Sequence, residues 1–64
     1  MDGTVIEQVG SLYNVELDDG RIVTAYLSGK FRMNYIRVTS GDRVTVELDS
    51  DDESKGRITY RYRQ

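Results

Sequence analysis

The sequence predicts an all-β domain, a single barrel of five strands with one short helix between its third and fourth strands. Three observations support this prediction. The chain has 64 residues, which is the size of one domain. Its six glycines stand apart from one another and divide it into segments of strand length. Several of these segments alternate apolar and polar residues, as a strand does when one of its faces is buried.

Three strands are predicted in the first part of the chain: Thr4–Val9, Leu12–Leu17 and Arg21–Leu27. In the second of these, Tyr13, Val15 and Leu17 share one face, which is mostly apolar. Asp19-Gly20 is a strong turn signal, because an Asp-Gly pair accepts the positive φ of a tight hairpin. We expect the three strands to form an antiparallel meander.

The next segment, Ser28–Thr39, breaks the alternation. Ser28 is of a residue type that caps helices, and Phe31 and Tyr35 stand four residues apart, on one face of a helix. The segment has room for one or two helical turns, so a short helix is predicted here. Its two rings are expected to plug one end of the barrel, to contact a ligand, or both.

Two further strands are predicted after this helix, Arg43–Leu48 and Arg57–Arg63, separated by the polar, acidic loop Asp49–Gly56. Three strands, a helix and two strands in a chain of this size predict a Greek-key barrel of the oligonucleotide/oligosaccharide-binding (OB) type. An SH3-like small barrel is the alternative, but it usually lacks a helix at this point. We therefore predict one OB-fold domain, S1-like in type, that spans residues 1–64.

Aromatic and basic residues alternate along the last predicted strand. Ile58, Tyr60 and Tyr62 are expected to pack inward. The opposite face is then expected to carry three arginines, either free or paired with acids of a neighbouring strand: Arg57, Arg61 and Arg63. The surface aromatics are expected to be the remaining tyrosines, Tyr13, Tyr26 and Tyr35.

The composition excludes most catalytic chemistry. The chain has no Cys and no His, so zinc fingers, iron–sulfur sites, redox dithiols and Ser-His or Cys-His nucleophiles are ruled out. The acids of Asp49–Glu53 have no apolar flank to raise a pKa, so a solvated loop is expected rather than a catalytic pair or a cation site. We predict no catalytic residue, no metal site and no cofactor, and we do not expect an enzyme.

The charge pattern is more informative than the net charge. A net charge of -2 and an isoelectric point of about 4.9 argue at first sight against a nucleic-acid partner. By segment, however, residues 1–19 carry -5, 20–46 carry +4, 47–53 carry -5 and 54–64 carry +4. Such blocks either solubilise a small barrel or form one acidic and one basic surface. Arg outnumbers Lys by seven to two, which favours the second interpretation, because Arg binds phosphates and bases through forked hydrogen bonds.

The basic segment from residue 30 to residue 37 interleaves cations, aromatic rings and an amide. Cations neutralise phosphates, aromatic rings stack on bases, and an Asn side chain reads a base edge. This combination suits irregular or unpaired RNA. The residues concerned are Lys30, Phe31, Arg32, Asn34, Tyr35 and Arg37.

Seven short pieces stand in a distinctive order and spacing: Gly3-Thr4-Val5, Tyr13-Asn14-Val15-Glu16-Leu17, Val23-Thr24-Ala25, Ser28-Gly29-Lys30, Arg32-Met33-Asn34-Tyr35-Ile36-Arg37, Gly41-Asp42-Arg43-Val44-Thr45-Val46-Glu47-Leu48 and Ser54-Lys55-Gly56-Arg57-Ile58-Thr59-Tyr60-Arg61-Tyr62-Arg63. With these pieces the chain resembles bacterial translation initiation factor one along almost its whole length. It departs from that family in Asp49–Glu53, where a Pro-Tyr-Asp-Leu-like stretch is usual and only Asp52 fits. The departure indicates a divergent or engineered member.

The resemblance implies a factor that binds the decoding (A) site of the small ribosomal subunit. It implies contacts with ribosomal RNA and a ribosomal protein, action together with the other initiation factors, and a block on premature tRNA entry without bond chemistry. With no apolar stretch long enough to span a membrane or form a signal peptide, a cytoplasmic monomer without a membrane partner is expected. The RNA-facing residues that the resemblance implies are Lys30, Arg32, Asn34, Tyr35, Arg37, Lys55, Arg57, Arg61 and Arg63.

The alternative is a non-catalytic OB barrel that binds a protein partner, or single-stranded nucleic acid, without ribosome specificity. A protein partner would use exposed strand edges or the acidic loop. A general single-strand binder needs several exposed aromatic rings on one sheet. The chain has one Phe and five Tyr, and part of these are expected to face inward, which disfavours a general single-strand binder.

Overall fold

The computed structural model of the protein describes residues 1–29, 31 and 37–62. The described residues form the five strands β1 (Asp2–Val9), β2 (Leu12–Leu17), β3 (Ile22–Leu27), β4 (Arg43–Leu48) and β5 (Lys55–Arg61). All five predicted strands are thereby confirmed, each to within two residues at either end. The largest difference is in β5, which begins and ends two residues earlier than expected. Its first two residues, Lys55 and Gly56, belong to the end of the predicted acidic loop.

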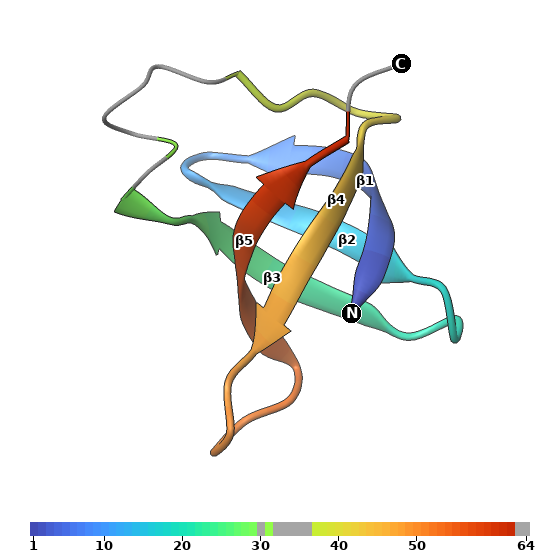
Figure 1. The fold of residues 1–64 in the computed structure, drawn as a ribbon, viewed down its shortest axis with the longest axis vertical. Coiled ribbons are helices and arrows are strands. Elements are labelled where there is room, and N and C mark those ends of the chain that lie inside the picture. The colour runs from blue at the N-terminus through green and yellow to red at the C-terminus, as the bar shows by residue number, and fades with distance from the viewer. Residues whose placement is uncertain (30, 32–36, 63–64) are drawn as a thin grey trace.

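The strands close into a barrel in the order β1-β2-β3-β5-β4 (Figure 1). The first three strands form the predicted antiparallel meander. β4 crosses over to pair antiparallel with β1, and β5 lies between β3 and β4, parallel to β3 and antiparallel to β4. This connectivity is that of the OB barrel, and its closure leaves none of the five described strands with a free edge. The turn from β4 to β5 protrudes at one end of the barrel, and residues 37–42 lie at the opposite end (Figure 1).

The core is built from the alternate residues of each strand that point into the barrel. Its buried members are Val5, Tyr13, Val15, Leu17, Val23, Ala25, Val44, Val46 and Ile58, together with Phe31 and Val38 from the connection between β3 and β4. Tyr13 is only 6% exposed, which makes its prediction as a surface aromatic wrong. It belongs to the same inward-facing alternation as its neighbours Val15 and Leu17.

A β-bulge in β5 reverses the expected direction of the last tyrosines. Val46 of β4 pairs with Ile58, but Thr45 pairs with Tyr60, so Thr59 is an extra residue without a partner of its own. The extra residue shifts the alternation by one. Tyr60 is therefore 52% exposed, and Tyr62 beyond it is also exposed, which makes the prediction that both pack inward wrong.

The described residues contain no helix as an element, which corrects the predicted short helix between β3 and β4. Gly29 and Phe31 have helical backbone geometry, and the Phe31 N–H donates to the Ser28 carbonyl oxygen at 3.0 Å. The rest of the predicted helix, residues 30 and 32–36, lies outside the described residues. Within those that are described, no helix is long and apolar enough to span a membrane.

Candidate nucleic-acid interface

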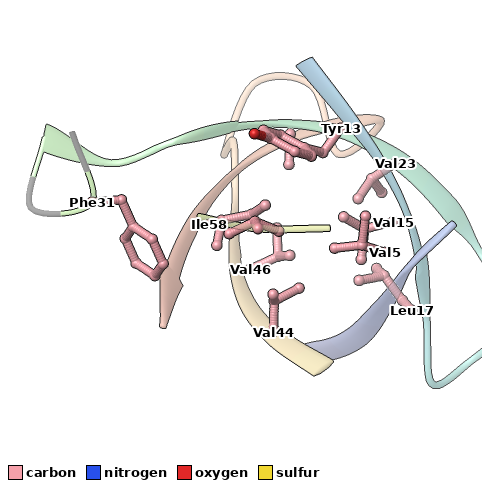
Figure 2. Close-up of a cluster of buried hydrophobic side chains, with 11 residues drawn as sticks. Val5, Tyr13, Val15, Leu17, Val23, Phe31, Val44, Val46 and Ile58 are labelled. Carbon is pink, nitrogen blue, oxygen red and sulfur yellow. The ribbon is translucent and has the colours of Figure 1, made fainter. Parts of the chain in front are cut away.

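The connection between β3 and β4 carries the basic segment, and two apolar side chains attach it to the barrel. Phe31 and Val38 are each 2% exposed. Figure 2 shows the Phe31 ring at one end of the core cluster, beyond Ile58 and Val46. The expectation that Phe31 plugs one end of the barrel is confirmed. Of the two anchors, Phe31 is the second residue of the basic segment and Val38 follows its last residue. Four of the residues predicted to face RNA in this segment lie outside the described residues: Lys30, Arg32, Asn34 and Tyr35.

Arg37 is the predicted RNA-facing residue of this segment that the structure describes, and it is exposed. Its main-chain carbonyl oxygen accepts a hydrogen bond of 2.6 Å from Nη1 of Arg61. The same Nη1 lies 3.7 Å from Oδ2 of Asp42. That carboxylate oxygen also accepts a hydrogen bond from the N–H of Thr39 at 2.9 Å. Arg61 thus connects the end of β5 to the loop that follows the basic segment.

Arg61 and Arg57 lie on different faces of β5. The expectation that these arginines share one face is therefore wrong. Arg61 lies opposite Val44, whose side chain is buried, and only about a quarter of the Arg61 side chain is exposed, at 27%. Arg57 lies on the other side of the bulge, opposite Glu47, whose side chain is exposed. The shift of alternation at Thr59 separates the two guanidinium groups. Arg63 lies outside the described residues.

Arg57 lies on the outer face of the barrel in a lateral row with Tyr26 of β3 and Glu47 of β4. Its Nη2 donates to Oε1 of Glu47 at 2.7 Å, and the two side chains remain 43% and 67% exposed. The Nε atom of Arg57 is screened from solvent and has no hydrogen-bond partner among the described residues. Lys55, two residues earlier on β5, is exposed and forms no ion pair with the part of the chain that is described.

A shallow groove of about 700 Å³ runs along this outer face. Its lining includes apolar side chains of three strands, Leu12, Tyr26 and Leu48, and both cations, Lys55 and Arg57. Glu47 and Asp49 line the same groove. OB folds bind ligands on the face of their second and third strands and at the loop between the fourth and fifth strands, and this groove touches both regions.

Two exposed aromatic side chains were missed by the sequence pattern. The rings of Tyr60 and Tyr62 meet edge to face with their centroids 5.0 Å apart. The Tyr62 hydroxyl donates to Oδ2 of Asp2 at 3.0 Å and accepts from Thr45 Oγ1 at 3.3 Å, which fixes its position. The arrangement follows from the unpaired Thr59, and the sequence carries no signal for it, because a bulge is defined by the register against the partner strand.

Acidic and basic residues of different segments form ion pairs with one another. Among the described residues, four arginines are in ion pairs: Arg21 with Asp19 and Glu53, Arg43 with Asp18, Arg57 with Glu47, and Arg61 with Asp42. Three of these arginines pair with acids of an acidic block, and Arg61 pairs with Asp42 of a basic block. The expectation of one acidic and one basic surface stays a prediction. The pairs confirm the alternative in which Arg57 pairs with an acid of a neighbouring strand.

The best-aligned of these pairs is between Arg43 and Asp18. Nη1 and Nη2 of Arg43 donate to Oδ1 and Oδ2 of Asp18 at 2.8 and 3.0 Å, a bidentate arrangement. The side-chain hydrogen bond from Arg43 holds the pKa of Asp18 below its ordinary value. A backbone hydrogen bond from Arg21 does the same for the pKa of Asp19. Both carboxylates are therefore charged at neutral pH.

Solved structures share the fold of this chain. YjeQ from Thermotoga maritima superposes with a TM-score of 0.83 at 27% identity, and YloQ, a circularly permuted GTPase, with 0.82 at 22%. The matches cover 97% of this chain and 22% of each of those chains, so this chain spans about a fifth of their length. Translation initiation factor one from the Wolbachia endosymbiont of Brugia malayi superposes with 0.79 at 33% identity, over 98% of this chain and 76% of that one.

These likenesses define the class of protein as an OB-fold barrel. The sequence then identifies the family, since residues 1–64 match the family model of translation initiation factor 1A / IF-1 from end to end. The chain belongs to the translation initiation factor 1A / IF-1 family, as its resemblance to initiation factor one predicted.

Proposed function

We propose that the protein binds the small ribosomal subunit at its decoding (A) site through ribosomal RNA. In this proposal it blocks premature tRNA entry, biases the local RNA conformation and acts with the other initiation factors, without catalysing a reaction. The observation that carries the proposal is the family match over the whole chain. It is supported by the exposed Arg37, which follows the anchored Phe31 and precedes the anchored Val38.

In this proposal the main RNA contacts come from the basic segment, residues 30–37, with Lys30, Arg32, Asn34, Tyr35 and Arg37. Lys55 on the outer face adds a cation that is not engaged by a described acid. Arg57 donates a hydrogen bond to Glu47, and Arg61 donates one to the Arg37 carbonyl oxygen. In this proposal each of them contributes less to RNA binding than a cation without such a contact. Arg63 remains in the proposed set on the strength of the family resemblance.

Co-sedimentation with purified small ribosomal subunits, with and without the other initiation factors, tests the proposal. We expect the protein to pellet with the subunits at low salt, where electrostatic attraction to phosphate is strongest. If about five phosphates are neutralised, the logarithm of the affinity should fall with the logarithm of salt with a slope of roughly -3.5 to -4.5. Absence of the protein from the pellet at low salt would contradict the proposal.

A second candidate function is binding to a protein partner. The four arginine ion pairs favour it, because they leave fewer free cations for RNA than the sequence predicted. Side chains of the loop between β4 and β5 are exposed, and Asp51 has no ion partner among the described residues. A salt-independent affinity and no protection of ribosomal RNA in footprinting would favour this candidate over RNA binding.

A further inference from the structure

We propose that the Glu47 carboxylate competes with RNA phosphate for Arg57, so that this ion pair sets the affinity of the outer face of the barrel. The proposal rests on the proposed function and deepens it, since it names the phosphodiester of the RNA as the ligand of this face. In the free protein, Glu47 is the anion that pairs with Arg57. Binding a phosphate there requires Arg57 to exchange one anion for another.

The geometry of the pair supports an exchange. Nη2 of Arg57 donates to Oε1 of Glu47 at 2.7 Å, within the range of a charge-assisted hydrogen bond. A guanidinium has five N–H donors in a planar fork that fits a phosphate as well as a carboxylate. Glu47 accepts from one of them, and Nε has no acceptor among the described residues. The hydrogen-bonding capacity of Arg57 is therefore incompletely used.

The surroundings of the pair leave it open to a ligand from outside. Both side chains are partly exposed, at 43% for Arg57 and 67% for Glu47, and both line the groove of about 700 Å³. Lys55 lies on the same face of β5 and lines the same groove, so it offers a second cation to an incoming strand. Tyr26 lies beside Arg57 on β3 and forms another wall.

The charges that line the groove determine how strongly this competition affects its affinity for phosphate. Lys55 and Arg57 are balanced there by Glu47 and Asp49, so the groove as it stands has little net attraction for phosphate. Asp49 accepts the N–H of Asp51 within its own loop at 2.8 Å and does not engage the arginine. Glu47 is thus the carboxylate whose removal frees the guanidinium. An ion pair of this exposure is weak, so it lowers the affinity without abolishing it.

The test compares Glu47→Gln with Asp51→Asn, measuring affinity for purified small subunits over a range of salt concentrations. Both variants remove one negative charge, and Asp51 has no arginine partner among the described residues. We expect Glu47→Gln to tighten binding about two- to five-fold, the strength of an exposed ion pair. Its salt slope should steepen by about 0.7 to 0.9, which corresponds to one more neutralised phosphate. Asp51→Asn should produce a smaller gain and little change of slope.

A double-mutant cycle with Arg57→Gln separates competition from a general change of charge. Once Arg57 has been replaced, the effect of Glu47→Gln should fall to that of Asp51→Asn, because no guanidinium remains to be released. Equal gains from Glu47→Gln and Asp51→Asn, or a gain that persists without Arg57, would overturn the competition while leaving RNA binding in place. Failure of every variant, including the unmodified protein, to pellet at low salt would instead overturn the proposed function and the competition with it.

Discussion

Nη1 of Arg61 donates a hydrogen bond of 2.6 Å to the main-chain carbonyl oxygen of Arg37, across 24 positions of sequence. The last strand thereby holds the loop at the C-terminal end of the basic segment. The same Nη1 lies 3.7 Å from Oδ2 of Asp42 and forms an ion pair with it. Arg61 is a positioning residue in this arrangement, since its charge is directed at the protein.

Replacing Arg61 by Ala should weaken binding to small subunits by roughly tenfold, the free-energy equivalent of one charge-assisted hydrogen bond. The slope of log affinity against log salt should stay nearly unchanged, because no phosphate contact is removed. Arg37→Ala is the matched comparison, and for this exposed residue we expect the slope to fall by about 0.7 to 0.9. Equal losses of slope in the two variants would show that Arg61 neutralises a phosphate itself.

Gly56 is required by the close approach of β4 and β5. A Cβ atom at this position would lie 2.5 Å from Cγ1 of Val46 and 3.0 Å from the Glu47 carbonyl oxygen. Gly56→Ala should therefore lower the free energy of unfolding by about 1 to 3 kcal/mol, the usual cost of overpacking. Urea denaturation followed by circular dichroism measures the change. Gly29→Ala is the control, because nothing lies within 4 Å of the added atom, and its effect should be small.

Phe31 links the stability of the barrel to the proposed RNA-binding segment. Its ring is buried, and its removal leaves a cavity at the end of the core, so Phe31→Ala should lower the free energy of unfolding by about 3 to 5 kcal/mol. Phe31→Leu keeps most of the buried volume and should cost about 1.5 kcal/mol or less. If Phe31→Leu remains folded, its affinity for small subunits reports how far the anchor positions the segment. Unchanged stability in Phe31→Ala would contradict burial of the ring.

The protein should lose stability in acid. Hydrogen bonds from Arg43, Arg21 and Ser54 lower the pKa values of Asp18, Asp19 and Asp52 in the folded state. Groups with a lowered pKa stabilise the fold fully above their unfolded pKa of about 3.9, and this contribution disappears as the pH falls through the folded pKa. The melting temperature should thus be level near neutral pH and fall below about pH 4. Asp18→Asn should make the acid decline shallower, and an unchanged decline would contradict a role for the Arg43 pair.

Alternation and turn chemistry determine most of the fold from the sequence alone. Leu12–Leu17 and Arg43–Leu48 have the predicted bounds, and the core residues that point into the barrel from them are Tyr13, Val15, Leu17, Val44 and Val46. Asp19-Gly20 lies between β2 and β3, where Gly20 adopts the positive φ that the turn signal predicted. These features are local, because a period of two residues and a Gly in a turn do not depend on the partner strand. The family could likewise be predicted, because its motifs recur at their characteristic spacing.

What the sequence determined by itself is the set of strands, the barrel and the family, together with the absence of Cys and His chemistry. Tertiary structure decided which charges remain available to RNA. The bulge at Thr59 turns Tyr60 outward and sends Arg57 and Arg61 to different sides, because the alternation shifts where one strand has an extra residue. Pairing of β5 with β4 then places Glu47 opposite Arg57. Such pairings join residues distant in sequence, and their electrostatic consequences depend on distances that exist only once the barrel has closed.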